Sequence, residues 1–126
     1  MKLVLDTNII LYHLGGRLAA PLPQQAMVSV SVISEMEVLS YPALTEAEET
    51  TIRRYLANLA IINLTEPIKQ TAISLRRQYK LKLPDAIIAA TAKELDAVLL
   101  TCDQQLLSVS DLAAQAPALL SVDGDP

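Results

Sequence analysis

The sequence is short of the residues that build disulfides, zinc sites and aromatic surfaces. Among its 126 residues it has one cysteine, one histidine, and no tryptophan or phenylalanine. One cysteine excludes a disulfide within the chain and is typical of a reducing cytoplasm. One cysteine and one histidine also exclude a zinc site built from Cys and His ligands. Because its four tyrosines are the only aromatic side chains, stacking on nucleic-acid bases would be weak.

Long apolar runs are lacking as well. No stretch approaches the roughly 18 apolar residues of a membrane-spanning helix, so no membrane association is expected. Asp6 comes too early for the apolar region of a signal peptide, which makes the cytoplasm the expected location. The composition, 52% hydrophobic and 19% charged, is too apolar for a disordered chain. The length is that of one domain, expected to span residues 1–126.

Short apolar strands alternate with helices along the chain. Strands are expected at residues 2–5, 27–32, 60–64, 97–101 and 118–122. Helices are expected at residues 8–14, 33–39, after the capping box of residues 45–48, from 65–67 to 79, at 84–95 and at 103–109. This alternation predicts a parallel sheet covered by helices on both faces. Residues 17–25 are expected to form a loop or a short broken helix, and residues 123–126 to fray.

Several prominent side chains have a structural interpretation. One face of the helix after the capping box carries an apolar stripe, which we interpret as core rather than as a partner groove: Ile52, Tyr55, Leu56 and Leu59. His13 lies away from every motif and is interpreted as a structural or surface residue. Cys102 is taken as incidental.

Three acidic residues stand where a predicted strand ends or a predicted helix begins, and a fourth lies on a helix that follows a strand. Asp6 follows the first strand and Asp103 follows the fourth, while Glu37 lies on the helix after the second strand. Asp85 opens an alanine-rich helix. Because open parallel sheets place ligands at the carboxyl ends of their strands, these side chains are expected to converge. Converging carboxylates repel one another, and Mg²⁺ or Mn²⁺ would relieve that repulsion.

Charge supports this grouping. The chain has a net charge of −4, which argues against a broad phosphate-binding surface. Without the four acids it would have as many acidic as basic residues. The basic side chains that gather just before Asp85 are either a solvated helix end or a phosphate-binding rim: Arg76, Arg77, Lys80 and Lys82.

Each acid also has a purely structural explanation. Asp6 and Asp103 can cap helices, and Asp85 suits the positive end of a helix dipole. Glu35 competes with Glu37, because spacing alone does not separate them. The signals are weak one by one, and together they indicate a metal-dependent site.

Four sequence blocks resemble the PIN domain family of metal-dependent ribonucleases, and above all the VapC toxins of bacterial and archaeal type II toxin–antitoxin systems. The blocks are VLDTNIIL at 4–11, SVISEMEVL at 31–39, LPDAIIAATA at 83–92 and LLTCD at 99–103. They occur in the family order with family-like spacing. The second block places its acid just before Val38 and Leu39, which favours Glu37.

The resemblance implies a three-layer α/β/α sandwich with a central parallel sheet. It also implies a catalytic and metal-binding acidic quartet around Mg²⁺ or Mn²⁺: Asp6, Glu37, Asp85 and Asp103. Asn8 and Thr101 would be polar supports, and Arg76, Arg77, Lys80 and Lys82 candidates for RNA binding. The implied activity is an endoribonuclease that leaves a 5′-phosphate and a 3′-hydroxyl. The implied partners are a second copy of the chain and a cognate antitoxin.

Two other functions compete with this interpretation. The first is a phosphotransfer protein with Asp6 as phospho-acceptor, disfavoured because Asn8 stands where a second acid is needed. The second is a catalytically silent PIN-like module that binds RNA or protein, disfavoured because a silent site has no use for four costly acids. For the toxin, an antitoxin is expected to bring Arg or Lys to the acids. Its amphipathic helix is expected in a groove near the first helix and residues 52–59.

Overall fold

Five short strands form one parallel sheet in the order β3-β2-β1-β4-β5. The computed structural model describes residues 1–121. Its strands are β1 (Lys2–Leu5), β2 (Met27–Ser31), β3 (Ala60–Ile62), β4 (Val98–Leu100) and β5 (Ala114–Gln115). Every neighbouring pair is parallel, as the alternation of strands and helices predicts.

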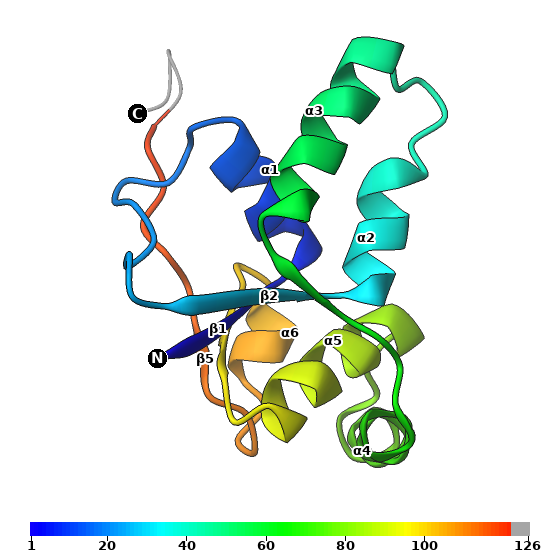
Figure 1. Ribbon diagram of the computed structural model, residues 1–126. Coiled ribbons are helices and arrows are strands. Elements are labelled where there is room, and N and C mark those ends of the chain that lie inside the picture. The colour runs from blue at the N-terminus through cyan, green and yellow to red at the C-terminus, as the bar shows by residue number, and fades with distance from the viewer. Residues whose placement is uncertain (122–126) are drawn as a thin grey trace.

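Helices cover both faces of this sheet. They are α1 (Thr7–Leu14), α2 (Val32–Leu39), α3 (Glu46–Ala57), α4 (Glu66–Tyr79), α5 (Leu83–Glu94) and α6 (Gln104–Leu107). Figure 1 shows α1, α2 and α3 above the sheet and α4, α5 and α6 below it. Val4 of β1 packs into the lower core and its neighbours Leu3 and Leu5 into the upper one, because successive strand residues point to opposite faces. The predicted three-layer α/β/α sandwich is confirmed.

The capping box opens α3 as predicted. Thr45 Oγ1 accepts a hydrogen bond from the Glu48 backbone N–H, and Glu48 Oε1 accepts one from the Thr45 N–H. The helix then buries Ile52 and Leu56 in the upper core, while Tyr55 is partly buried beside them. The apolar stripe is therefore core, as its interpretation required.

The last predicted strand is wrong. The fifth strand is Ala114–Gln115, and Leu119 makes only an isolated antiparallel bridge with Leu18. Pro117 has no N–H to donate, so a regular ladder does not continue from β5 into residues 118–121. Residue 122 of the predicted strand and the predicted frayed tail, 123–126, lie outside the described residues.

Other boundaries move by a few residues. Residues 17–25 form a loop without a helix, and the predicted helix at 103–109 is shortened to Gln104–Leu107. The predicted strand at 27–32 ends at Ser31, because the Ser31 side chain accepts a hydrogen bond from the Ile33 N–H and begins α2. None of the helices in the described part of the chain has the length and apolar character needed to span a bilayer.

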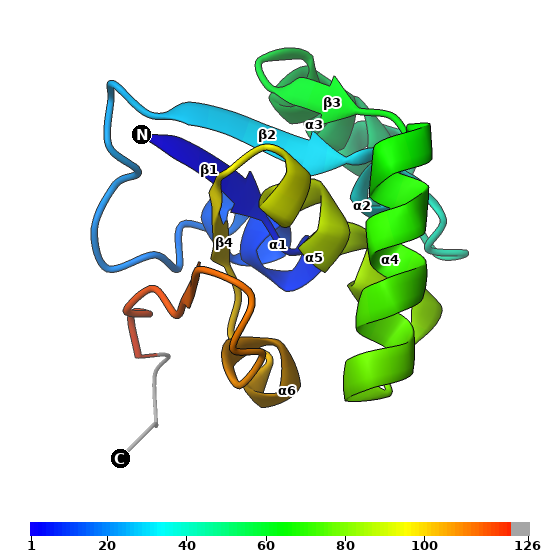
Figure 2. The ribbon, with the colours of Figure 1, turned by 90° about the horizontal axis from the view of Figure 1, so that it is seen from below.

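The sheet order places the C-terminal ends of three strands side by side. Figure 2 shows β1 between β2 and β4. The Asp6 N–H donates to the Leu100 carbonyl oxygen at 3.0 Å, which extends the pairing of β1 with β4 by one residue. The segments that leave β1, β2 and β4 therefore start from the same edge of the sheet, where ligands bind in open α/β folds.

Candidate metal centre

Asp6 is the buried centre of this edge. It is 7% exposed, although a carboxylate is costly to bury. It is also the N-cap of α1, and its Oδ1 accepts a hydrogen bond from the Thr7 N–H at 2.8 Å. Its Oδ2 accepts one from Thr101 Oγ1 at 2.7 Å. The capping role and a place in the quartet are therefore compatible, because one carboxylate serves both.

Thr101 connects Asp6 to Asp103. Its hydroxyl is fully buried, donates to Asp6 and accepts from the Asp103 N–H at 3.0 Å. Asp103 is the N-cap of α6, and its Oδ1 accepts from the N–H groups of Gln105 and Leu106. Thr101 thus links Asp103, in the short segment after β4, to Asp6.

Glu37 reaches the same edge from α2. Its Oε1 accepts a hydrogen bond from Thr7 Oγ1 at 2.7 Å. Glu35, the competing acid, instead lines a separate hollow with residues of α3 and β3. The structure therefore places Glu37, and not Glu35, beside Asp6 and Thr7.

Asp85 lies in the first turn of α5, where the helix dipole alone would favour its charged form. Its pKa is nevertheless raised above the ordinary value, first by burial and then by the charges of Asp6, Asp103 and Glu37. Lys82, the N-cap residue of α5, opposes that rise. A structural role at a helix start does not explain an environment that disfavours the charge.

Asp6 shows the same electrostatic pattern. Burial raises its pKa most, the hydrogen bonds from Thr101 and Thr7 lower it, and the charges of Asp103 and Glu37 raise it again. The charges of Glu37 and Asp103 therefore act on both Asp6 and Asp85 and disfavour their ionisation. A divalent cation is the kind of ligand that would offset this repulsion.

The donor set fits a hard divalent ion. Carboxylate oxygens are the ligands that Mg²⁺ and Mn²⁺ prefer, and a positive ion would offset the repulsion at Asp6 and Asp85. Within residues 1–121, no group of three or more His, Cys, Asp or Glu side chains is arranged to hold a metal ion in its present conformation. The chemistry of the quartet thus fits the ion, while the side chains of Asp6, Glu37 and Asp103 are held in place by other hydrogen bonds.

Four basic residues lie between the end of α4 and the start of α5. Arg76 and Arg77 are exposed in the last turn of α4, and Lys80 ends that helix in a left-handed conformation with φ of 56°. Gln105 Nε2 donates to the carbonyl oxygens of Tyr79 and Lys80, which ties this turn to α6. Only Lys82 is placed by its electrostatic effect on Asp85.

Within residues 1–121, the side chains of three other residues discussed above form no hydrogen bond with the acids. Asn8 is exposed, and in the described part of the chain no hydrogen bond joins its side chain to the quartet. His13 Nδ1 lies 2.7 Å from the Tyr55 hydroxyl and connects α1 to α3, and burial raises the pKa of Tyr55 to about 12. Cys102 is half-buried and packs against the upper core.

Sequence reasoning missed Thr7 and Ser34. Thr7 donates to Glu37, and Ser34 Oγ lies 3.0 Å from the Thr7 hydroxyl inside the protein. A signal for Ser34 was present, because a residue three positions before Glu37 shares its helix face. The only sequence signal for Thr7 was its place directly after Asp6, and a threonine at that place is equally typical of a helix start.

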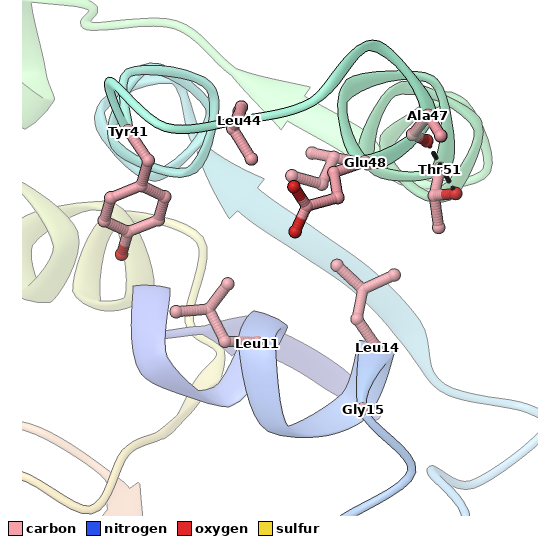
Figure 3. Close-up of a pocket in the computed structure, with 9 residues that line it drawn as sticks. Leu11, Leu14, Gly15, Tyr41, Leu44, Ala47, Glu48 and Thr51 are labelled. Carbon is pink, nitrogen blue, oxygen red and sulfur yellow. Dashed lines mark hydrogen bonds between the residues drawn. The ribbon is translucent and has the colours of Figure 1, made fainter.

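An apolar hollow lies on the α1–α3 side of the molecule. It has a volume of about 460 Å³ and is lined by residues of α1, of α3 and of the loop between α2 and α3. Figure 3 shows Leu11 and Leu14 on one wall, Tyr41 and Leu44 across from them, and the Glu48 carboxylate among these apolar side chains. This hollow is called the α1–α3 groove below.

Comparison with known families identifies the chain. The PIN domain model matches residues 3–112, so the chain belongs to the PIN domain family, as its sequence blocks predict. PIN domains of VapC toxin–antitoxin systems are typically nucleases. A comparison with functionally curated proteins found no match.

Solved structures with the same fold come from toxin–antitoxin complexes. A toxin–antitoxin complex from Klebsiella pneumoniae is 34% identical with a TM-score of 0.72, over 86% of this chain and 93% of that one. VapBC2 from Rickettsia felis, bound to a promoter DNA fragment, is 20% identical with a TM-score of 0.79, over 94% and 100%. VapBC-1 from nontypeable Haemophilus influenzae is 23% identical with a TM-score of 0.72, over 92% and 98%. The predicted VapC-type fold is confirmed.

Proposed function

We propose that the chain is a single PIN domain that acts as a metal-dependent endoribonuclease, the toxin of a type II toxin–antitoxin pair in the cytoplasm. The observation that carries this proposal is the set of hydrogen bonds through Thr7 and Thr101 that brings Asp6, Glu37 and Asp103 to one edge of the sheet. The charges of all three also raise the pKa of Asp85, after its burial. Acids gathered at the carboxyl edge of a sheet, where burial and neighbouring charges disfavour the ionisation of Asp6 and Asp85, are typical of a functional site.

Asp6, Glu37, Asp85 and Asp103 are the residues that would hold Mg²⁺ or Mn²⁺. When bound, the ion would activate water and offset the charge that develops on an RNA phosphodiester. The chain's own residues prepare this site. Thr101 fixes Asp6 and the backbone of Asp103, and the buried position of Asp6 keeps bulk water from screening its charge.

RNA would approach along the basic side of the quartet. Lys82 is close enough to Asp85 to act on its charge, so its ammonium group can meet a phosphate of RNA held at the acids. Arg76, Arg77 and Lys80 extend the same exposed turn, and we propose that they contact further phosphates. The small number of cations predicts modest affinity with a shallow dependence on salt.

The antitoxin would bind in the α1–α3 groove. The groove joins the first helix to Ile52, the region expected from the sequence to receive an amphipathic partner helix. Its apolar walls suit the hydrophobic face of such a helix, while Glu48 offers one carboxylate to a basic residue of the partner. The toxin–antitoxin complexes that share this fold support an antitoxin as the occupant.

The homodimer stays a prediction from the family resemblance. Apolar side chains are exposed on several faces, for example Met36, Ile73 and Leu83, and are available for contact with a second copy. Sedimentation equilibrium of the purified chain tests it, with a mass of twice 13.7 kDa expected.

RNA cleavage by the purified full chain tests the proposed function. Single-stranded RNA labelled at one end is incubated with Mg²⁺ or Mn²⁺, with and without a chelator, and the fragment ends are analysed. We expect cleavage only with free metal ion, leaving a 5′-phosphate and a 3′-hydroxyl. RNA that is bound and left intact with Mn²⁺ would favour the silent binding module. Phosphorylation of Asp6 by acetyl phosphate would favour the phosphotransfer protein.

A further inference from the structure

Thr7 holds oxygens of two different acids. Its backbone N–H donates to Asp6 Oδ1 at 2.8 Å, and its side-chain hydroxyl donates to Glu37 Oε1 at 2.7 Å. Asp6 follows β1, whereas Glu37 lies on α2 in another part of the sequence. One half-buried residue therefore sets the position of Glu37 relative to Asp6.

The Thr7 hydroxyl has a second contact, with Ser34. The two hydroxyl oxygens lie 3.0 Å apart, and Ser34 is completely buried. A hydroxyl has one proton, and the Glu37 oxygen at 2.7 Å is the nearer acceptor and the stronger one. The main hydrogen bond of the Thr7 hydroxyl is therefore the one to Glu37, and Ser34 Oγ is a longer second acceptor.

This chain of hydrogen bonds has a consequence for Glu37. A free glutamate side chain has many rotamers, and fixing one of them on metal binding costs conformational entropy. Here Thr7 already holds Oε1, which leaves Oε2 without that contact. We propose that Thr7 is a positioning residue, which presets Glu37 for a divalent ion shared with Asp6. This inference rests on the proposed metal site.

Mn²⁺ binding to the full-length chain, measured by calorimetry, tests this role without relying on activity. Thr7→Val keeps the shape and removes the hydroxyl, and it is expected to weaken Mn²⁺ binding about 10- to 100-fold, as losses of hydrogen bonds to metal ligands do. Thr7→Ser keeps the hydroxyl and is expected to bind close to wild type. Rescue by serine separates a hydrogen bond from mere packing.

The chain offers a matched control. Thr71 Oγ1 donates to Glu94 Oε1 at 2.9 Å, the same kind of bond between α4 and α5 on an exposed surface. Thr71→Val should leave Mn²⁺ binding unchanged. Circular dichroism and melting accompany each variant, and if Thr7→Val does not fold, Thr7→Ala takes its place, again with weaker binding expected.

RNA cleavage gives a second measurement. In Thr7→Val the Mn²⁺ concentration for half-maximal rate should rise, while KM for RNA at saturating metal stays near wild type. The positioning role is overturned if folded Thr7→Val binds Mn²⁺ as tightly as wild type. It is also overturned if Thr7→Ser binds Mn²⁺ as weakly as Thr7→Val. If wild type then still binds Mn²⁺ and cleaves RNA, the proposed function stands alone. If wild type binds no Mn²⁺, both fail.

Discussion

Thr101 Oγ1 donates a 2.7 Å hydrogen bond to Asp6 Oδ2 across 95 residues of sequence, inside the protein. The same hydroxyl accepts from the Asp103 N–H, so it joins the first acid of the quartet to the last. Thr7 makes the corresponding connection from Asp6 to Glu37. Two threonines thus organise three of the four acids.

Replacing Thr101 by valine should weaken both the fold and the metal site. The substitution leaves a buried Asp6 oxygen without its donor, which costs about 1–3 kcal/mol. It also removes a bond that lowers the pKa of Asp6, so the pKa should rise further. We expect a lower Tm and Mn²⁺ binding about 10- to 100-fold weaker, measured by calorimetry. Thr101→Ser should restore both, and a valine variant that matches wild type would contradict the role.

Asp85→Asn should stabilise the metal-free protein at neutral pH. Because the pKa of Asp85 is raised above 3.8 in the fold, ionisation costs stability as the pH rises from that value through the raised pKa. The melting temperature of metal-free Asp85→Asn should therefore exceed that of wild type at pH 7, and the difference should vanish near pH 3.8. A difference that is constant with pH would argue against the electrostatic explanation.

Divalent metal should reverse the order of the two proteins. An ion that binds only the folded state adds about 2.7 kcal/mol when its free concentration is about 100 times Kd. Millimolar Mg²⁺ or Mn²⁺ should therefore raise the Tm of wild type by several degrees and that of Asp85→Asn by much less, as measured by thermal unfolding. An identical response of the two proteins would remove Asp85 from the ligand set.

The sequence predicted the sheet and the acids because both depend on local patterns. Short apolar runs between amphipathic helices indicate a parallel sheet wherever they occur, and a carboxylate after a strand is visible without knowing the fold. The small side chains of Ala86, Ala89 and Ala90 likewise predict a helix that approaches the sheet closely, and all three are completely buried.

The contacts between acids could not be predicted in this way. Thr7 meets Glu37 only because β1 and β2 are neighbours and the two helices that follow them start together. Asn8 follows Thr7 in the sequence, yet the rotation of α1 turns its side chain outward. The position of strand β5 was predicted wrongly for a related reason. Its two residues are placed by pairing with β4, not by an apolar run of their own.

Leu14→Glu should separate inhibition from catalysis. Leu14 lines the α1–α3 groove, where losing a buried leucine costs about 1.5–3 kcal/mol, or roughly 10- to 100-fold in affinity. If an antitoxin is found in a neighbouring reading frame, we expect weaker binding to it, measured by calorimetry, with RNA cleavage by the chain alone unchanged. Thr50→Glu adds the same charge on the exposed side of α3 and should leave binding intact. Equal affinity of both variants would place the antitoxin elsewhere.

The most direct test compares RNA cleavage by wild type and Asp6→Asn at equal protein concentration, with Mn²⁺ supplied and Thr71→Val purified in parallel as a preparation control. Asp6 lies at the centre of the quartet, and its isosteric replacement removes one repelling charge without removing volume. The account predicts a folded variant whose metal-free Tm is at or above that of wild type and whose cleavage is abolished, while Thr71→Val cleaves normally. Full cleavage by Asp6→Asn would contradict the assignment of the quartet as a catalytic metal site.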